Sequence, residues 1–312
     1  MRHAIPAALA ALLLVIPVAC SSADDQLRFE SPEAAIAASV DAVRADDEAR
    51  LVAILGEDSS DLLHSGDPIA DREARERFLA NFDAKHEVAM IDADRAEVSI
   101  GERAWPFPIP IVRDDAGWRF DTEAGRETIL ARRIGRNELA TIAVCRALVD
   151  AQMEYASVDR DDDGILEFAP RLRSTPGRRD GLYWETMEGE EPSPIGALVA
   201  EAAARGYTLD ADAATPQPFN GYYFKMLREQ GAHAAGGAYS YLAGEHMIGG
   251  FAVVAYPARP GDSGVMTFAV NQAGTVFEAD LGADTAARVA EMTAFDPGPG
   301  WSAIAEDGAA SR

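Results

Sequence analysis

The sequence predicts an α+β protein made of two units, each with helices that precede an antiparallel sheet. Helical patterns fill most of residues 31–82 and give way to strand-like runs; one long helical stretch then covers residues 122–159, and further strand-like runs follow it. Helices and strands in separate runs, rather than in alternation, are typical of α+β proteins. A chain of 312 residues with 48% hydrophobic residues is long enough for two cores.

The first unit is expected over residues 29–125. Ser31 is a suitable N-cap, Pro32 suits the first helical position and Glu33 favours the positive end of the helix dipole, so a helix is predicted to begin there. Helices are also predicted over residues 47–55 and 71–82, and strands over residues 86–91, 95–100, 109–113 and 118–120. The order of these elements and the last hairpin, residues 112–120, resemble the nuclear-transport-factor-2-like cone.

The second unit is expected over residues 126–302, with its longest helix over residues 136–157. Cys145 lies in the apolar pattern of that helix and is predicted to be a buried side chain rather than a nucleophile. Strands are predicted over residues 222–227, 251–256, 265–271 and 276–279. A long helix before a small antiparallel sheet resembles the globular part of type IV pilins and pseudopilins. Residues 303–312 are expected to form a flexible tail.

The N-terminal residues predict a targeting signal. Arg2 and His3 precede a weakly polar run over residues 4–19, which predicts a signal peptide over residues 1–19. Val18-Ala19-Cys20 resembles the end of a bacterial lipoprotein signal, in which the cysteine is acylated; Pro17 departs from that pattern and leaves ordinary signal-peptidase cleavage open. Residues 20–28 are expected to be a tether. The predicted location is the periplasm, as a lipoprotein anchored to the outer membrane, and secretion is the alternative.

The charge balance excludes several partners. The chain has 28 Lys and Arg residues against 52 Asp and Glu residues, a formal net charge of −24. A field of that sign repels phosphate backbones and anionic lipid surfaces. We therefore expect no nucleic acid partner, and contact with a membrane only through an N-terminal lipid.

Five long strings carry a resemblance that covers Phe29 to Trp301. They are Ser65-Gly66-Asp67-Pro68, Trp105-Pro106-Phe107-Pro108-Ile109-Pro110, Arg132-Arg133-Ile134-Gly135-Arg136-Asn137-Glu138-Leu139, Asp180-Gly181-Leu182-Tyr183-Trp184 and Gly249-Gly250-Phe251-Ala252-Val253-Val254-Ala255-Tyr256-Pro257. On these strings the chain resembles the bacterial family known as domain of unknown function 2950. The resemblance implies a secreted or lipid-anchored envelope protein and brings no established reaction.

An acidic loop after the long helix has part of a calcium-binding pattern. Asp159, Asp161 and Asp163 occupy positions 1, 3 and 5, and Gly164 follows at position 6; Ile165 offers a backbone carbonyl and Glu167 a further carboxylate. Pro170 stands where a bidentate acid is expected. Calcium is therefore the one cofactor that the sequence suggests, in an incomplete and weak site; a solvated acidic turn is the alternative.

Two groups of arginines stand out from the acidic background. Arg132, Arg133 and Arg136 crowd the start of the predicted helix, where acidic partners such as Glu127 or Glu138 would offset them; a phosphate or sulfate site is the alternative. The second group, Arg171, Arg173, Arg178 and Arg179, is expected to pair with the acidic loop, with an anion clamp as its alternative.

No catalytic set is recognisable in the sequence. Asp262-Ser263-Gly264 with His246 imitates a hydrolase set, but Ser263 is predicted to be a structural residue of a turn. Scattered histidines without metal-binding spacing argue against zinc. Trp105, Tyr183 and Trp184, with the glycine-rich loop 231–237, are candidates for the border of an aromatic groove.

These observations favour a non-enzymatic envelope protein that acts as a binding module for a protein or other envelope partner. The alternative is a small-ligand receptor or a hydrolase whose pocket lies in the open end of the first unit, with His64, Asp67 or Asp71 pointing into it. Assembly with a pilus or a secretion system is a third hypothesis and rests on fold analogy alone.

Overall fold

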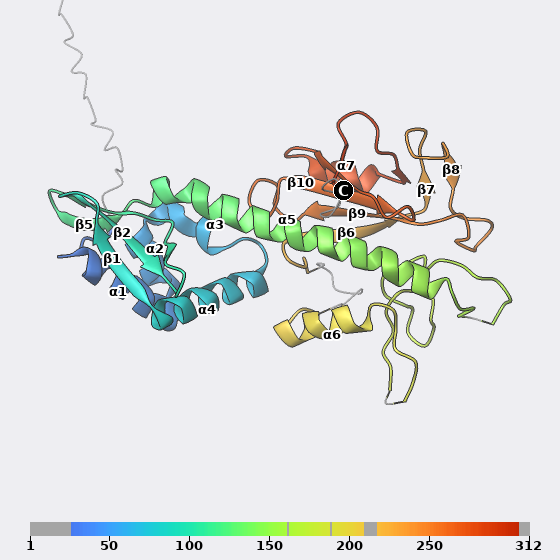
Figure 1. Ribbon diagram of the computed structural model, residues 1–312, viewed down its shortest axis with the longest axis horizontal. Coiled ribbons are helices and arrows are strands. Elements are labelled where there is room, and N and C mark those ends of the chain that lie inside the picture. Colours follow the sequence, from blue (N-terminus) through green and yellow to red (C-terminus); the bar gives the residue numbers. More distant parts are fainter. Residues whose placement is uncertain (1–25, 161, 188, 209–216, 306–312) are drawn as a thin grey trace, which may run out of the picture.

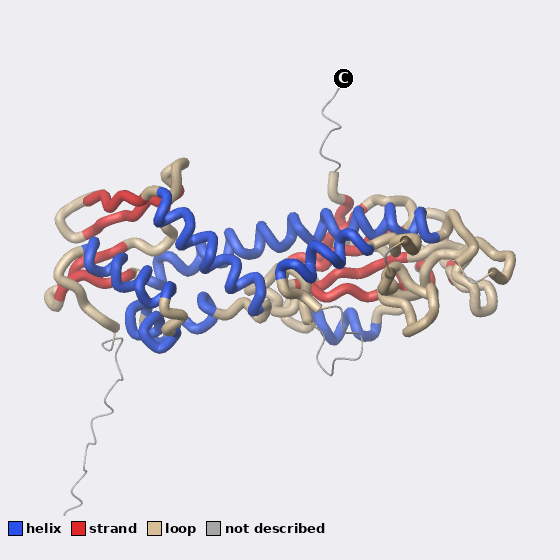
Figure 2. The backbone as a smooth tube through the Cα atoms, turned by 90° about the horizontal axis from the view of Figure 1, so that it is seen from below, coloured by secondary structure: helices blue, strands red, loops and turns tan. Residues whose placement is uncertain are grey.

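The computed structural model describes residues 26–160, 162–187, 189–208 and 217–305 and confirms the α+β class. One unit lies at each end of an elongated molecule, and the helix α5 (Thr122–Tyr155) runs along both of them (Figures 1 and 2). The predicted signal peptide, Cys20, the first part of the tether, Asp161 and residues 306–312 lie outside the described residues.

The first unit packs four helices and a short 3₁₀ turn against an antiparallel sheet. Its helical elements are α1 (Pro32–Arg44), α2 (Glu48–Leu55), η1 (Glu57–Ser59), α3 (Ser60–Leu63) and α4 (Pro68–Ala84). Ser31 caps α1 as predicted, because its hydroxyl accepts a hydrogen bond from the amide of Ala34 at 3.1 Å. Ile36, Ile54 and Phe82 from these helices lie in one core with Ile111 and Phe120 of the sheet.

The sheet of the first unit is a meander of short strands. Its strands are β1 (His86–Met90), β2 (Arg95–Ile100), β3 (Trp105–Pro106), β4 (Ile111–Asp114) and β5 (Gly117–Phe120), in the order β1-β2-β4-β5 with β3 paired to β2. The proline-rich segment thus contributes only the two-residue strand β3, since each proline removes a backbone donor. Before α1, the amide of Leu27 donates to the carbonyl of Ala53 at 2.8 Å. Residues 26–28, predicted as tether, are therefore attached to the first unit.

The predicted start of the long helix at Arg136 is wrong, since α5 begins at Thr122 and continues for 34 residues. Asp121 caps it, and Gly125 allows close packing there, because a Cβ at this position would lie 2.7 Å from a side-chain carbon of Ile109. Ile129 packs on the first core, whereas Leu148 and neighbouring residues of α5 belong to the second core. Packing at both ends outweighs the helix-weakening effect of Gly135. The boundary expected at residue 125 falls inside this shared helix.

The second unit places a five-stranded sheet between two helices. Its strands, in the order β13-β11-β10-β9-β6, are β6 (Tyr222–Leu227), β9 (Ala252–Pro257), β10 (Met266–Asn271), β11 (Val276–Asp280) and β13 (Ser302–Ala303). Val253 and Ala255 of β9 share a core with α5, whereas Ala252 and Val254 share one with Val289 of α7 (Thr285–Glu291). This strand is buried on both faces, which accounts for its unbroken apolar sequence.

Smaller elements complete the second unit. They are α6 (Gly196–Arg205) and the short strands β7 (Glu229–Gln230), β8 (Tyr239–Ser240) and β12 (Ala294–Phe295), which form a sheet in the order β12-β7-β8. The expectation of a flexible tail is wrong for Ala303 and Ile304, because β13 pairs with β11 and the amide of Ile304 donates to the carbonyl of Val276 at 2.8 Å.

A buried carboxylate joins the two units. Asp67 is 0% exposed, and one of its oxygens caps α4 by accepting hydrogen bonds from the amides of Ile69 and Ala70 at 3.2 and 3.0 Å. The other oxygen accepts from the hydroxyl of Tyr207 at 2.9 Å and from the amide of Gly221 at 3.0 Å, both in the second unit. Asp67 therefore holds the start of α4 against Tyr207 and Gly221 of the second unit.

We predict that Asp67→Ala lowers the free energy of unfolding by about 3 kcal/mol, because buried donors and a helix cap lose their acceptor together. Tyr207→Phe removes one donor and should cost about 1 kcal/mol. Urea denaturation followed by circular dichroism measures both. Asp58→Ala, at an exposed position of the first unit, is the control and should stay within about 0.5 kcal/mol of the parent protein. Equal stabilities of Asp67→Ala and Asp58→Ala would contradict the role given to Asp67.

Candidate functional site

A groove of about 980 Å³ lies between α4, α5 and α6. Figure 1 shows α4 and α6 following each other along one side of α5. The groove is lined by residues of both units, from Phe78 in the first to Phe219 in the second. Most of its accessible lining is apolar. The apolar side chains include Val43, Leu55, Phe78, Phe107, Ile129, Ala140, Ala143, Val144, Ala147, Leu198 and Phe219.

The sequence of α5 explains the apolar wall of the groove. Arg136, Ala140, Ala143 and Ala147 follow one another at spacings of three or four residues, and such residues share one face of a helix. Alanine side chains leave space beside the helix, and Leu198 of α6 and Phe219 line the groove with them. This face of α5 is therefore a track of small side chains that begins at an arginine.

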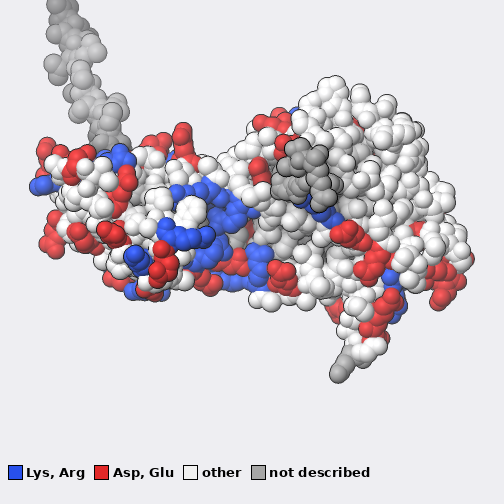
Figure 3. Space-filling model, in the orientation of Figure 1, with Lys and Arg blue, Asp and Glu red and all other residues white. Residues whose placement is uncertain are grey.

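The charged residues that line the groove are mainly positive, although the chain as a whole is negatively charged. Its lining contains seven arginines, namely Arg75, Arg77, Arg103, Arg132, Arg133, Arg136 and Arg205, against the three carboxylates of Asp71, Glu73 and Glu201. Figure 3 shows Lys and Arg side chains gathered in the middle of this face of the molecule. In a chain with a formal net charge of −24, this is a local concentration of positive charge.

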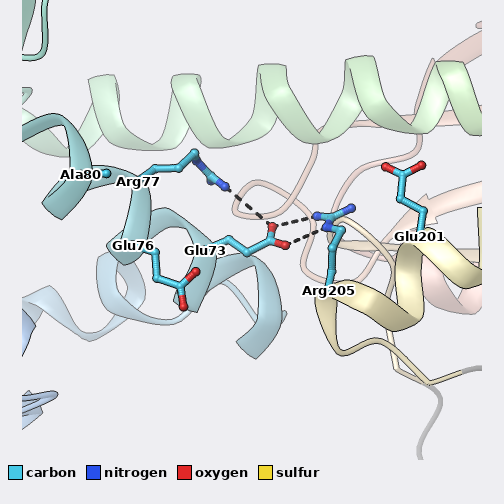
Figure 4. A pocket seen from close by; sticks show the side chains of 6 residues that line it. All are labelled: Glu73, Glu76, Arg77, Ala80, Glu201 and Arg205. Carbon is cyan, nitrogen blue, oxygen red and sulfur yellow. Dashed lines mark hydrogen bonds and ion pairs between the residues drawn. The ribbon is translucent and has the colours of Figure 1, made fainter.

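Two of these arginines hold the two units together. Arg133 forms an ion pair with Asp262 of the second unit and donates to the carbonyl of Leu62 of the first unit at 2.7 Å. Arg205 binds both carboxylate oxygens of Glu73 on α4, at 2.7 and 2.8 Å. Figure 4 shows this pair, with Arg77 directed to the same carboxylate and 3.7 Å from it. The hydrogen bond from Arg205 is the main reason why the pKa of Glu73 lies below its usual value.

Three other arginines of the groove have no carboxylate partner in the described part of the chain. Arg132 donates to the carbonyl of Pro106 at 2.9 Å, and both Arg132 and Arg103 lie over the ring of Trp105. Arg136 has no hydrogen bond or ion pair with any described residue, and its side chain lines the groove. Burial by surrounding protein atoms, followed by the charges of Arg77 and Arg133, lowers the pKa of Arg136.

The prediction that Arg132, Arg133 and Arg136 oppose a helix dipole is wrong, because α5 begins ten residues or more before them. The acidic partners suggested for them are also wrong. Glu138 accepts instead from the amides of Val265 and Met266, each at 2.9 Å, and the partner of Arg133 comes from the second unit. That partner, Asp262, is far from Arg133 in the sequence, so the spacing of residues along the helix could not reveal the ion pair.

The acidic loop uses its carboxylates locally. The two oxygens of Asp159 accept from the amides of Asp162 and Gly164 at 2.9 and 2.8 Å, and Asp163 accepts from the amide of Ile165 at 2.7 Å. Within the ranges that the structure describes, which omit Asp161, no group of three or more His, Cys, Asp or Glu residues is arranged to hold a metal ion.

Glu167 and Asp163 also approach a histidine. The Nδ1 atom of His246 lies 3.4 Å from an oxygen of each carboxylate, and Glu167 accepts from the amide of Met247 at 3.0 Å. The loop is thereby attached to the segment before β9. Calcium binding by Asp159, Asp161, Asp163, Ile165 and Glu167 stays a prediction.

The structure does not bring the three aromatic candidates together. Trp105 is exposed and lines the groove beside Arg132. Trp184 belongs to the second core, where Arg160 lies over both its ring and that of Tyr155; Tyr183, next to it, packs against the same core. Because 23 residues of α5 separate Arg132 from Tyr155, the two ends are about 35 Å apart.

The side chains considered for catalysis are buried or hydrogen-bonded within the protein. Cys145 is 0% exposed, and burial raises the pKa of its thiol to about 12. Ser263 is also buried, and its hydroxyl accepts from the amide of Arg259 at 3.0 Å and donates to the carbonyl of the same residue at 3.2 Å. The Nε2 atom of His64 is within hydrogen-bond distance of a carboxylate oxygen of Glu48, at 2.9 Å. Asp71 lines the groove and accepts a hydrogen bond from the amide of Ser65 at 3.0 Å.

The fold and the groove together define an α+β protein in which two units share one helix and surround an apolar groove lined with arginines. The family model described as "Protein of unknown function (DUF2950)" matches residues 26–304, and the chain belongs to this family. No curated protein and no solved structure matches the chain. None of the helices in the described part of the chain is long and apolar enough to cross a membrane.

We predict that Cys145 does not react with iodoacetamide in the native protein, because its thiol is buried and its raised pKa leaves almost no thiolate near neutral pH. Mass spectrometry of the intact chain should show modification at this residue only after denaturation. Rapid native modification at Cys145 would contradict its buried placement.

The calcium prediction is tested by calorimetric titration of the protein with Ca²⁺. The loop pattern predicts weak binding with a millimolar dissociation constant that Asp163→Ala abolishes. Glu278→Ala, in the second unit outside the loop, is the control and should leave the heats unchanged. Identical heats for the parent protein and Asp163→Ala would contradict the prediction.

Proposed function

We propose that this chain is a non-enzymatic binding protein of the bacterial cell envelope that holds an apolar ligand in the groove between α4, α5 and α6. The groove itself is the observation that carries the proposal. Its volume of about 980 Å³ lies within the range of sites that enclose small ligands, about 300–1,000 Å³. The envelope location rests on the predicted signal peptide and on the resemblance of Cys20 to an acylated lipoprotein cysteine.

The lining supports an apolar ligand because several large apolar side chains are covered by protein on one side and face the groove on the other. Phe78, Phe107 and Ile129 are only partly buried, although they pack against the first core, and Leu198 and Phe219 are in the same position at the second core. A continuous apolar surface of this kind is typical of a binding site. The groove thus extends the interiors of both units outward into solvent.

The polar side chains of the groove support binding rather than catalysis. Neither Cys145 nor Ser263 lines it, and its described lining includes neither His nor Cys. Glu73 is engaged by Arg205, and Asp71 accepts from a backbone amide. The hydroxyls of Ser39 and Ser65 also line the groove, and each is hydrogen-bonded to a backbone group, at 2.8 and 3.3 Å. The groove therefore offers mainly arginines and apolar side chains to a ligand.

The proposal is tested with Nile red, a neutral probe whose fluorescence rises in apolar surroundings. We expect saturable binding to the parent protein, and binding at least tenfold weaker in Ala143→Trp, because the indole fills the track on α5. Ala131→Trp introduces the same side chain at an exposed position of α5 outside the groove and should bind the probe as the parent protein does. Circular dichroism confirms that both variants are folded. Absent binding, or equal binding by both variants, would refute the proposal.

A further inference from the structure

We infer that the ligand of the groove is an aliphatic chain that ends in an oxyanion, with Arg136 as the contact for the oxyanion and the small-residue face of α5 as the contact for the chain. The inference rests on the proposed function and adds the chemical class of the ligand. It is carried by the charge inside the groove and by the order of residues along α5.

The arginines of the groove exceed the carboxylates that neutralise them. Arg133 and Arg205 have ion pairs with Asp262 and Glu73, so their charge is used within the protein. Arg103, Arg132 and Arg136 have no carboxylate partner among the residues described. Arginines placed together without counterions repel one another, and a bound oxyanion removes that repulsion.

Arg136 is the arginine best placed to meet such a ligand. It lines the groove together with Arg77 of α4 and Arg133. Burial and the charges of these two arginines lower its pKa, and the charge of Glu73, which Arg205 already engages, opposes this effect. Nothing in the described protein uses its guanidinium donors, although five N–H groups in a planar fork suit a carboxylate or a phosphate. A negatively charged group at this point would interact with three guanidinium groups at once.

The surface that would contact the aliphatic part of the ligand begins next to Arg136. From Arg136 the same face of α5 continues through Ala140 and Ala143 to Ala147, a length of about 16 Å at the rise of an α-helix. Phe219 and Leu198 also line the groove, as does Glu201 on the same helix as Leu198. A straight apolar chain attached to the oxyanion would lie along these side chains without a change of direction.

The same stretch is unsuitable for a peptide. A polypeptide carries a donor and an acceptor at almost every residue, and these need partners once they are buried. Ala140, Ala143 and Ala147 offer no side-chain partners, and polar groups enter the lining only from other positions, such as Asn137, Glu201 and Asn220. An aliphatic chain has no such requirement, so charge at one end and apolar surface along the rest favour an amphiphile.

The test is competition against Nile red by ligands that share a twelve-carbon chain: dodecanoate, dodecyl phosphate and the neutral dodecanol, each below its aggregation limit. We expect the two oxyanions to displace the probe at concentrations about tenfold lower than dodecanol, equivalent to one charge-assisted contact. Added NaCl should reduce that advantage. Inorganic phosphate alone should not displace the probe, because it lacks the chain.

Arg136→Gln should weaken dodecanoate and dodecyl phosphate about tenfold and leave dodecanol unchanged, since only the oxyanion contact is lost. Arg146→Gln, at an exposed position of α5 outside the groove, is the matched control and should leave all three ligands unchanged. Two results would overturn the inference: displacement of the probe by dodecanol and by the oxyanions at equal concentrations, or an equal weakening of all three ligands in Arg136→Gln. The proposed function would still be upheld in either case, because Nile red binds. Displacement by inorganic phosphate alone would also overturn the inference. Absence of Nile red binding would refute both.

Discussion

The arrangement of the two units depends on the carboxylate of Asp67. It caps α4 in the first unit and accepts hydrogen bonds from Tyr207 and Gly221 in the second, at a position that water does not reach. Such a carboxylate is tolerated in the interior only when its lone pairs are satisfied, so all of its partners must be in place together. The relative position of α4 and α6, and with it the groove, follows from this requirement.

The long helix α5 gives the groove its continuous wall. It contributes Ile129 to the first core and Leu148 to the second, so one rigid element crosses both units. Arg133, near its middle, joins Leu62 on one side to Asp262 on the other. Because α5 is held at both ends, the guanidinium of Arg136 can lie in the groove without a hydrogen-bond partner among the described residues, beside the small side chains of Ala140 and Ala143.

The large negative charge of the chain gives the groove its selectivity in our proposal. An acidic surface repels anions at a distance, whereas arginines collected in a concave apolar site attract them over a few ångströms. Bilayers and nucleic acids, which expose many charges on a broad surface, stay disfavoured. A single oxyanion on an apolar chain brings only one or two charges into the groove, where Arg136 and its neighbours exceed the carboxylates.

Local signals in the sequence were sufficient for the α+β class, the cap at Ser31, the meander of the first unit, the burial of Cys145 and the family. These features depend on residues a few positions apart, which physical chemistry couples directly. The extent of α5, the role of Asp67 and the partner of Arg133 depended on contacts between residues up to 154 positions apart, as in the hydrogen bond from Gly221 to Asp67. The sequence showed that Arg132, Arg133 and Arg136 are unusual in an acidic chain. Only the tertiary structure decided which of them is neutralised, because their neighbours come from the other unit.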